Sequence, residues 1–360
     1  LRLPDHAEPD EQAAPEDVRQ ALTLARELSD DELIARSEII FTRAEWRILL
    51  TCLERSADLA LQGTIDFDDQ ILFPAFFRVS FPSYPLILVD EAQDLSPLNH
   101  ILLVKLTKTR IIAVGDSFQA IYAFRGADES SMSSLRQMFK METYHLTTTF
   151  RCAESIVEHV RWRAPLIRAW DKNPHSPGEI HYPLFWSAGD IPSGAAILCR
   201  NNAPLLSCAI YLLRNGKYPK LWGNDIAAGL LKTLEKLGPG ATRRNDALHL
   251  LSQWEEEQLR KLRTESAKRA LSDRASCIRI FLAETETLGE ALAFGKSVFE
   301  MQGPIDLATV HKAKGAEWEQ VFILEPHLFG EEGQERNLRY VAATRAKRSL
   351  SYITAEGREE

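Results

Sequence analysis

The sequence contains no run of about 20 consecutive apolar residues, the length that a helix needs to cross a bilayer, so we expect no transmembrane helix and no membrane partner. Its five cysteines are scattered and include no Cys-x-x-Cys pair. This spacing argues against a zinc site and favours a reduced, cytoplasmic compartment. Excess positive charge is also absent. A net charge of −8 counts against nucleic-acid binding over the whole surface but permits a local basic groove.

Four short apolar runs give the clearest structural signal in the 360 residues. They cover residues 86–89, 111–114, 195–199 and 321–324. β-branched residues occur in these runs, and segments with helical spacing separate them. Such a pattern is typical of buried parallel strands joined by helices, so the sequence predicts an α/β fold. The length predicts two or three domains.

Two adjacent acids, Asp90 and Glu91, follow the first apolar run directly. Burying two carboxylates at a strand end is costly unless they hold a cation or take part in chemistry. Phosphoryl-transfer enzymes use such a pair to bind Mg²⁺ and to orient or deprotonate water. The dipeptide alone is also compatible with a simple cap of the next helix.

The acid pair belongs to the first of five motifs. In chain order these are DEAQD at 90–94, GDSFQAIYAFRGA at 115–127, LTTTFRC at 146–152, TVHKAKGAEW at 309–318 and LRYVAATRAK at 338–347. The set resembles the superfamily 1 DNA helicases of the UvrD/PcrA/Rep type, with some features of their compact phage-type members. The run DFDD at 66–69 is typical of the same family. The resemblance covers roughly residues 60–355 and is weak in the middle.

The resemblance implies two RecA-like lobes with parallel sheets, the first of them incomplete, and a small helical insertion. The predicted divisions are 1–60 as the helical remnant of a first-lobe insertion, 61–147 as the C-terminal part of the first lobe, 148–224 with 301–360 as the second lobe, and 225–300 as a helical insertion in the second lobe. In this family ATP lies between the lobes and single-stranded DNA crosses them.

The resemblance also implies roles at the phosphates of ATP. Asp90 would bind Mg²⁺, and Glu91 would act at the metal and activate water. Gln119 occupies the position that senses the γ-phosphate, where its amide can donate a hydrogen bond. Arg151 and Arg345 match the two arginines that reach this phosphate from the second lobe, where guanidinium groups neutralise the charge of the transferred phosphoryl group.

Nucleoside contacts follow from the same resemblance. Glu317 matches the acid that contacts the sugar, and Phe150 occupies the aromatic position that packs on the adenine ring. We therefore expect Phe150, Arg151, Glu317, Arg345 and Gln119 to bind ATP.

DNA contacts are expected from two of the motifs. Tyr122, Phe124 and Arg125 follow the phosphate sensor, and aromatic rings stack on bases without reading sequence. Core packing is the alternative for Tyr122 and Phe124. His311 and Lys314 match DNA-contacting residues of the family.

A phosphate-binding loop, Gly-x-x-x-x-Gly-Lys-Ser/Thr, is absent from the sequence. The nearest run, Gly295-Lys296-Ser297, has Glu290 where the pattern needs glycine. The chain also starts at Leu1 rather than Met. We expect this chain to be the C-terminal part of a longer helicase, with the missing segment on the same gene product. A degenerate relative that binds without hydrolysis is the alternative, and a loop supplied by a separate polypeptide is a third.

The sequence therefore predicts an ATP- and Mg²⁺-dependent helicase or translocase. It would act on single-stranded DNA or duplex–single-strand junctions, in the 3′–5′ direction by resemblance. Replication or repair proteins are expected as partners, and we expect the chain alone to be inactive. The alternative is a non-catalytic DNA- or partner-binding module of a larger replication or recombination assembly.

Overall fold

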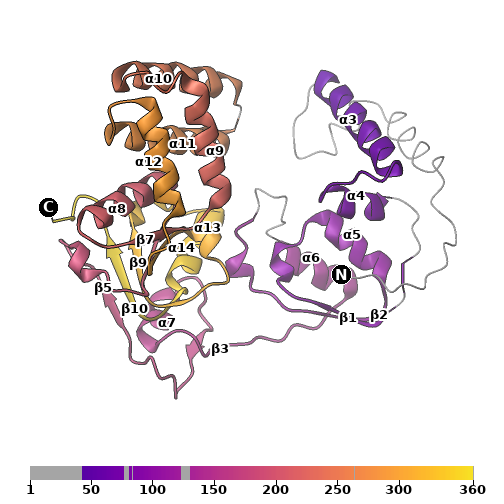
Figure 1. Cartoon of the computed structure of the whole chain (residues 1–360). Coiled ribbons are helices and arrows are strands. Elements are labelled where there is room, and N and C mark those ends of the chain that lie inside the picture. The colour runs from indigo at the N-terminus through magenta and orange to yellow at the C-terminus, as the bar shows by residue number, and fades with distance from the viewer. Residues whose placement is uncertain (1–42, 77–80, 83, 123–129, 263, 360) are drawn as a thin grey trace. The chain divides into compact units, whose positions relative to one another are not determined.

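The computed structural model describes residues 43–76, 81–82, 84–122, 130–262 and 264–359. The chain forms two compact units, Leu1–Thr143 and Tyr144–Glu360 (Figure 1). Of the segment 1–60 that the sequence predicts to be helical, residues 1–42 lie outside the described part. The four-part division of the chain stays a prediction.

The first unit contains a parallel pair of strands and several helices. Its elements are α3 (Arg43–Leu61), α4 (Asp69–Phe76), β1 (Tyr84–Val89), the short 3-10 turn η1 (Ala92–Asp94), α5 (Pro97–Leu106), β2 (Thr107–Ala113), η2 (Ser117–Gln119) and α6 (Ser131–Phe139). The predicted apolar run at 86–89 lies in β1, and that at 111–114 lies in β2 except for Val114, with Ile87 opposite Ile111.

Local capping explains where α5 begins. The Ser96 hydroxyl accepts a hydrogen bond from the Asn99 backbone N–H, and the Asn99 side chain accepts one from the Ser96 backbone N–H. Pro97 occupies the first helical position, where a missing N–H costs nothing. On the other side of η1, the buried Ser131 hydroxyl donates to the Ala92 carbonyl over 2.6 Å and fixes α6 against the turn.

The second unit is built on six parallel strands in the order β5-β10-β9-β6-β8-β7. The elements of this unit outside the helical insertion are β3 (Thr148–Thr149), α7 (Glu154–Val160), β4 (Arg168–Ala169), β5 (Glu179–His181), η4 (Ala188–Asp190), β6 (Ala196–Cys199), α8 (Asn202–Arg214), β7 (Pro219–Leu221), β8 (Ile305–Thr309), α13 (Val310–Ala313), β9 (Trp318–Leu324), η5 (Pro326–Leu328), α14 (Gly333–Ala343) and β10 (Ala346–Ile353). The runs at 195–199 and 321–324 form the adjacent strands β6 and β9. The predicted α/β fold with parallel strands is confirmed.

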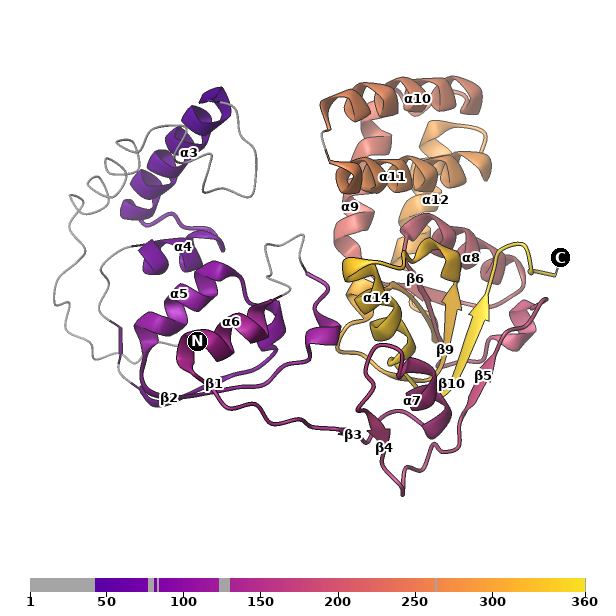
Figure 2. The same ribbon diagram turned by 180° about the vertical axis from the view of Figure 1, so that it is seen from behind.

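Four helices interrupt the second unit between β7 and β8: α9 (Asn224–Leu237), α10 (Arg244–Lys261), α11 (Glu265–Ala283) and α12 (Leu288–Glu300). They lie together beyond one end of the six-stranded sheet (Figures 1 and 2). Leu234, Leu251, Ile278 and Phe281 are fully buried among them, so these helices have a core of their own.

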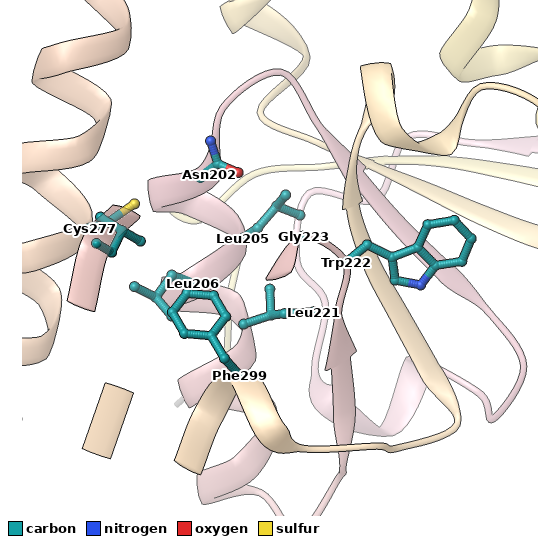
Figure 3. A pocket seen from close by; sticks show the side chains of 9 residues that line it. Asn202, Leu205, Leu206, Leu221, Trp222, Gly223, Cys277 and Phe299 are labelled. Carbon is teal, nitrogen blue, oxygen red and sulfur yellow. The ribbon is translucent and has the colours of Figure 1, made fainter. Parts of the chain in front are cut away.

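A small cavity lies where the helices meet the sheet. α8, the end of β7, α9, α11 and α12 contribute its mostly apolar lining, which includes Leu206, Trp222, Cys277 and Phe299 (Figure 3). Its volume of 20 Å³ has room for about one water molecule. The cavity is therefore a packing gap rather than a ligand site. Across the part of the chain that the structure describes, no helix combines the length and apolar character needed to cross a bilayer.

Candidate nucleotide- and DNA-binding site

The two acids predicted to serve Mg²⁺ and water lie at the carboxyl end of β1. Gly115 and Asp116 follow the parallel strand β2, so the DEAQD and GDSFQ motifs lie at the same edge of the sheet. Both Asp90 and Glu91 are exposed. The expectation that these two carboxylates are buried at the strand end is wrong, because both are open to solvent.

Glu91 is held in an unusual backbone conformation. Its φ of 49° and ψ of 39° lie in the left-handed region, which costs a non-glycine residue about 1–2 kcal/mol. Its backbone N–H donates to Asp90 Oδ1 over 2.9 Å. Strain of this kind clusters at functional sites, where the surrounding structure enforces it.

Gln93 connects the two motifs of the first unit. Only 1% of this residue is exposed. Its amide nitrogen donates to Glu91 Oε2 over 2.5 Å, and its amide oxygen accepts the backbone N–H of Asp116 over 2.9 Å. A Cβ on Gly115 would lie 2.5 Å from that oxygen, so the contact requires glycine there.

Asp116 extends this connection to Gln119. One carboxylate oxygen accepts the Phe118 N–H over 2.9 Å, and the other accepts the Gln119 side-chain amide over 2.8 Å. A continuous chain of hydrogen bonds thus joins Glu91, Gln93, Asp116 and Gln119. Tyr122 is half-buried after this turn. Phe124 and Arg125 lie outside the described residues.

In the second unit, two short parallel strands bring two aromatic rings together. β3 pairs with β4, with Thr149 opposite Ala169, and the Trp170 N–H donates to the Thr149 carbonyl. Phe150 and Trp170 therefore leave their strands at the same edge. Their ring centroids are 5.5 Å apart at an interplanar angle of 54°. Phe150 is 67% exposed, so its ring is available for stacking.

Arg151, the residue after Phe150, belongs to a cluster of ion pairs. Arg151 Nε donates to Glu317 Oε2 over 2.5 Å, and Lys347 Nζ lies 2.8 Å from Glu317 Oε1. These contacts join three of the motifs. The hydrogen bond from Lys347, together with that from Arg151, holds the pKa of Glu317 below its usual value. The carboxylate is therefore ionised at neutral pH and both its oxygens are engaged.

An open pocket of 510 Å³ lies over this cluster. Its lining is Leu146, Thr148, Thr149, Phe150, Arg151, Ile167 and Glu317. Three of the residues predicted to bind ATP thus share one pocket, although more than 160 positions separate the first two from the third.

Arg345 lies behind the pocket rather than in its lining. It is 1% exposed, with Nε donating to the Val341 carbonyl over 3.1 Å and Nη1 to the Ala316 carbonyl over 3.2 Å. Burial, together with the nearby charge of Arg151, lowers the pKa of Arg345 to about 10. The guanidinium remains charged at neutral pH. In this structure, therefore, Arg151 faces the pocket and Arg345 supports the backbone around it.

His311 and Lys314 lie in and just after the short helix α13, which follows β8. Both side chains are half-buried. Gly315 follows with a φ of +88°, so the chain turns sharply before Glu317. The turn carries the predicted DNA contacts and the predicted sugar contact within seven residues.

Comparisons with known proteins match two regions of the chain. The family profile of the UvrD/REP helicase N-terminal domain matches residues 27–140, and that of the UvrD-like helicase C-terminal domain matches residues 304–352. The chain is UvrD-like in one region of each unit.

Curated relatives of this UvrD-like chain are named DNA helicases. It is 28% identical to F-box DNA helicase protein 1 of Schizosaccharomyces pombe, over 90% of this chain and 39% of that protein. It is 26% identical to F-box DNA helicase 1 of Gallus gallus, over 74% of this chain and 29% of that protein. A shorter match, 44% identical over 20% of this chain, covers 11% of DNA helicase IV of Escherichia coli. The chain thus spans at most 39% of the length of these three relatives.

Sequence reasoning missed three residues of this UvrD-like site: Gln93, Trp170 and Lys347. Gln93 and Lys347 lie inside the quoted motifs, close to residues with predicted roles, and this position was the signal that could have identified them. Trp170 lies 20 residues after Phe150, and only the pairing of β3 with β4 brings the two rings together.

A further carboxylate positions β9, the strand that begins directly after Glu317. Asp306 Oδ1 accepts the indole N–H of Trp222 over 2.7 Å, and Oδ2 accepts that of Trp318 over 2.8 Å. Trp318 directly follows Glu317, and Trp222 lies two residues before α9, the first helix of the insertion. The start of the insertion is therefore tied to the strand beside the pocket.

Proposed function

We propose that this UvrD-like chain carries the ATP-hydrolysing and DNA-moving machinery of a helicase that acts on single-stranded DNA and its junctions in the 3′–5′ direction. The main support is the pocket that gathers Phe150, Arg151 and Glu317 from distant motifs. An exposed ring suits a nucleobase, and a guanidinium suits phosphate oxygens. Glu317, already ionised and held by two cations, suits a sugar hydroxyl.

The first unit supplies groups that suit Mg²⁺ and water. Mg²⁺ is usually held by one or two carboxylates together with phosphate oxygens and water, and the exposed Asp90 and Glu91 fit that donor set. When bound, the ion would neutralise phosphate charge. Glu91 would accept the proton of the attacking water. Gln93 would fix the direction of the Glu91 carboxylate and, through Asp116, the position of Gln119.

In the second unit, Arg151 and Arg345 would neutralise charge on the transferred phosphoryl group. DNA contacts are assigned to His311 and Lys314, with Tyr122, Phe124 and Arg125 from the first unit. Contacts by stacking and phosphate pairing would be independent of sequence and would weaken with salt. Replication or repair proteins as partners and a cytoplasmic compartment belong to the same proposal. The phosphate-binding loop is assigned to a segment outside these residues.

A second candidate function rests on the absence of that loop from the sequence. The sequence contains no Gly-x-x-x-x-Gly-Lys-Ser/Thr, and without such a loop the chain could serve as a DNA- or partner-binding module of a larger assembly. The two candidates differ in one property, because only the first requires DNA-stimulated ATP hydrolysis.

The experiment is ATP hydrolysis and DNA binding, with and without single-stranded DNA, by the 360-residue chain alone and by the chain completed with a segment that carries the phosphate-binding loop, for the parent and for Glu91→Gln. Glu91→Gln should abolish turnover and leave ATP binding intact, while Glu142→Gln, an exposed acid of the same unit, should change neither. Turnover that survives Glu91→Gln would exclude the assigned role of Glu91. DNA binding without any turnover, even when an upstream segment is added, would establish the binding module instead.

A further inference from the structure

An exposed tryptophan lies on the second unit, outside the pocket described above. Trp162 follows α7 and is 43% exposed. Two arginines of α14 lie over its ring: the guanidinium carbon of Arg336 is 5.7 Å from the centroid, and that of Arg339 is 5.3 Å away. Both arginines are exposed. An indole ring and two cations thus meet on one open surface.

The two segments that form this surface are fixed to each other. Arg163 donates from both Nε and Nη2 to Asn337 Oδ1, over 2.9 and 2.7 Å. This forked contact ties the turn that carries Trp162 to the middle of α14. The ring and the two arginines are therefore held in place before any ligand arrives, which reduces the entropy lost on binding.

A second exposed aromatic ring lies beside His159, three residues before Trp162. The exposed ring of Tyr182, which follows β5, stacks on Tyr352 of β10, with centroids 5.0 Å apart and an interplanar angle of 4°. The Tyr352 hydroxyl shares a 2.6 Å hydrogen bond with His159. The centroid of the His159 ring lies 6.4 Å from that of Tyr182 and 5.5 Å from that of Tyr352, and His159 comes three residues before Trp162, so this second ring system lies beside the end of α7.

We call Trp162, Tyr182, Arg336 and Arg339 the aromatic–arginine face. The whole chain carries a net charge of −8, yet among the described residues no carboxylate lies within ion-pair distance of Arg336 or Arg339. Like charges three residues apart on a helix repel each other. The fold therefore holds two mutually repelling cations beside exposed rings, an arrangement that an anionic ligand would stabilise.

We propose that the aromatic–arginine face is a second binding surface for single-stranded nucleic acid, separate from the DNA contacts assigned to His311 and Lys314. Bases would stack on Trp162 and Tyr182, and backbone phosphates would pair with Arg336 and Arg339. Rings interleaved with arginines bind single strands without regard to sequence, because every base has a flat face. An acidic polypeptide would use the arginines but would gain little from two exposed flat rings, so the rings favour nucleic acid.

Fluorescence anisotropy of a labelled oligothymidylate tests whether Arg336 and Arg339 pair with phosphates. The double variant Arg336→Gln/Arg339→Gln should weaken binding at least about fivefold and reduce the slope of log affinity against log salt by roughly 0.7 for each arginine removed. Arg260→Gln/Lys261→Gln removes the same charge from exposed positions on α10 and should change neither quantity. Equal losses in the two double variants would overturn the proposal, because they would mean that only net charge matters.

A comparison of Trp162→Phe with Trp162→Ala tests whether a base stacks on the Trp162 ring. Phenylalanine keeps a stacking face, so Trp162→Phe should retain most of the affinity, whereas Trp162→Ala should lose about fivefold or more. Thermal unfolding of both variants checks that the fold is kept. Identical affinities for the two folded variants would overturn the stacking role.

Photo-crosslinking locates the strand directly and separates this proposal from the assigned DNA site. An oligonucleotide carrying a photoreactive uracil should crosslink to peptides that contain Trp162 or Tyr182, and these crosslinks should persist in Lys314→Ala. Crosslinks that vanish together with those around His311 would overturn a separate surface. Competition by polyglutamate as strong as that by unlabelled oligothymidylate would overturn nucleic acid as the ligand and point to an acidic polypeptide.

Discussion

The two units build similar strands from similar apolar runs but bury them very differently. All four residues of β6 in the second unit are buried, and Leu198 is 0% exposed. In the first unit, β1 has no fully buried residue, and Leu88 is 71% exposed. Both strands run parallel to their neighbours, so strand type does not cause the difference.

The number of neighbours explains the contrast. β6 lies between β8 and β9, and α8 packs against the same sheet with Leu205, Cys208 and Leu212 in its core. Within the described residues, β1 pairs with β2 alone. An apolar run therefore indicates which segments form strands, but only the surrounding elements decide how deeply those strands are buried.

The largest expected effect tests this contrast directly. Leu198→Ala should lower the free energy of unfolding of the second unit by about 2–5 kcal/mol, because it leaves a cavity among fully buried neighbours. Leu88→Ala should change that of the first unit by less than about 0.5 kcal/mol, since the side chain is already exposed. Urea unfolding followed by hydrogen exchange in peptides of each unit measures both values. Comparable losses in the two variants would mean that β1 is buried as deeply as β6.

In each unit, the side-chain amide of a buried residue holds a loop of the site in place, and Gln93 makes the larger number of contacts with site residues. Gln93 joins Glu91 to the loop after β2, whereas Asn173 in the second unit joins its turn to the Cys152 carbonyl over 2.9 Å. Gln93→Met keeps the size but leaves the Asp116 N–H and nearby carboxylates without their partner. The first unit should lose about 1–3 kcal/mol.

Hydrogen exchange of the peptide that contains Asp116 measures the same change locally. Gln137→Met, at an exposed position on α6, is the matched control and should leave both stability and exchange unaltered. Unchanged exchange at Asp116 in Gln93→Met would show that Gln93 does not hold this loop.

The sequence was informative about strands and less so about their surroundings. All four apolar runs formed parallel strands, and the acids after the first run lie at the end of that strand, as predicted. The exposure of Asp90 and Glu91 could not be predicted, because it depends on elements far away in the chain. The pairing of Phe150 with Trp170 was missed for a related reason: two-residue strands have no periodicity to recognise.

Each unit contains a glutamate with a left-handed backbone conformation, and the two side chains differ in their environment. Glu91 in the first unit and Glu325 in the second both follow a parallel strand with positive φ, 49° and 54°. Glu325 is 9% exposed, and its carboxylate accepts the Ala355 N–H over 2.6 Å, so that side chain stabilises the end of β10. The Glu91 carboxylate is exposed and accepts from the Gln93 side chain.

Replacing each glutamate by glycine should therefore shift stability in opposite directions. Glu91→Gly relieves the left-handed strain, and the Gln93 amide that loses its acceptor still has Asp94 Oδ2 3.4 Å away, so the first unit should be stabilised by up to about 1 kcal/mol. Glu325→Gly relieves similar strain but leaves the Ala355 N–H without its acceptor, so a net loss of about 1 kcal/mol is expected. Thermal unfolding of the two variants measures the difference. Destabilisation by Glu91→Gly would show that Glu91 supports the fold as Glu325 does.

The smallest effect concerns the ion pairs at the pocket. The pKa of Glu317 is lowered by the hydrogen bond from Lys347 and then by Arg151, so its contribution to stability is present above the usual glutamate pKa of about 4.3 and is lost as the pH falls below it. Lys347→Met should raise this pKa toward its usual value. Because the carboxylate is 39% exposed and Arg151 remains, the loss at neutral pH should stay below about 1 kcal/mol.

Carboxyl titration by NMR, combined with urea unfolding at neutral and acidic pH, separates this effect from a packing defect. The stability difference between Lys347→Met and the parent should disappear in acid, where Glu317 is protonated in both proteins. Arg348→Met, at the exposed neighbouring position of β10, should leave the Glu317 pKa unchanged. A stability loss that is equal at both pH values would mean that Lys347 acts through packing. The Glu317 carboxylate would then owe its low pKa to Arg151, the arginine that faces the pocket.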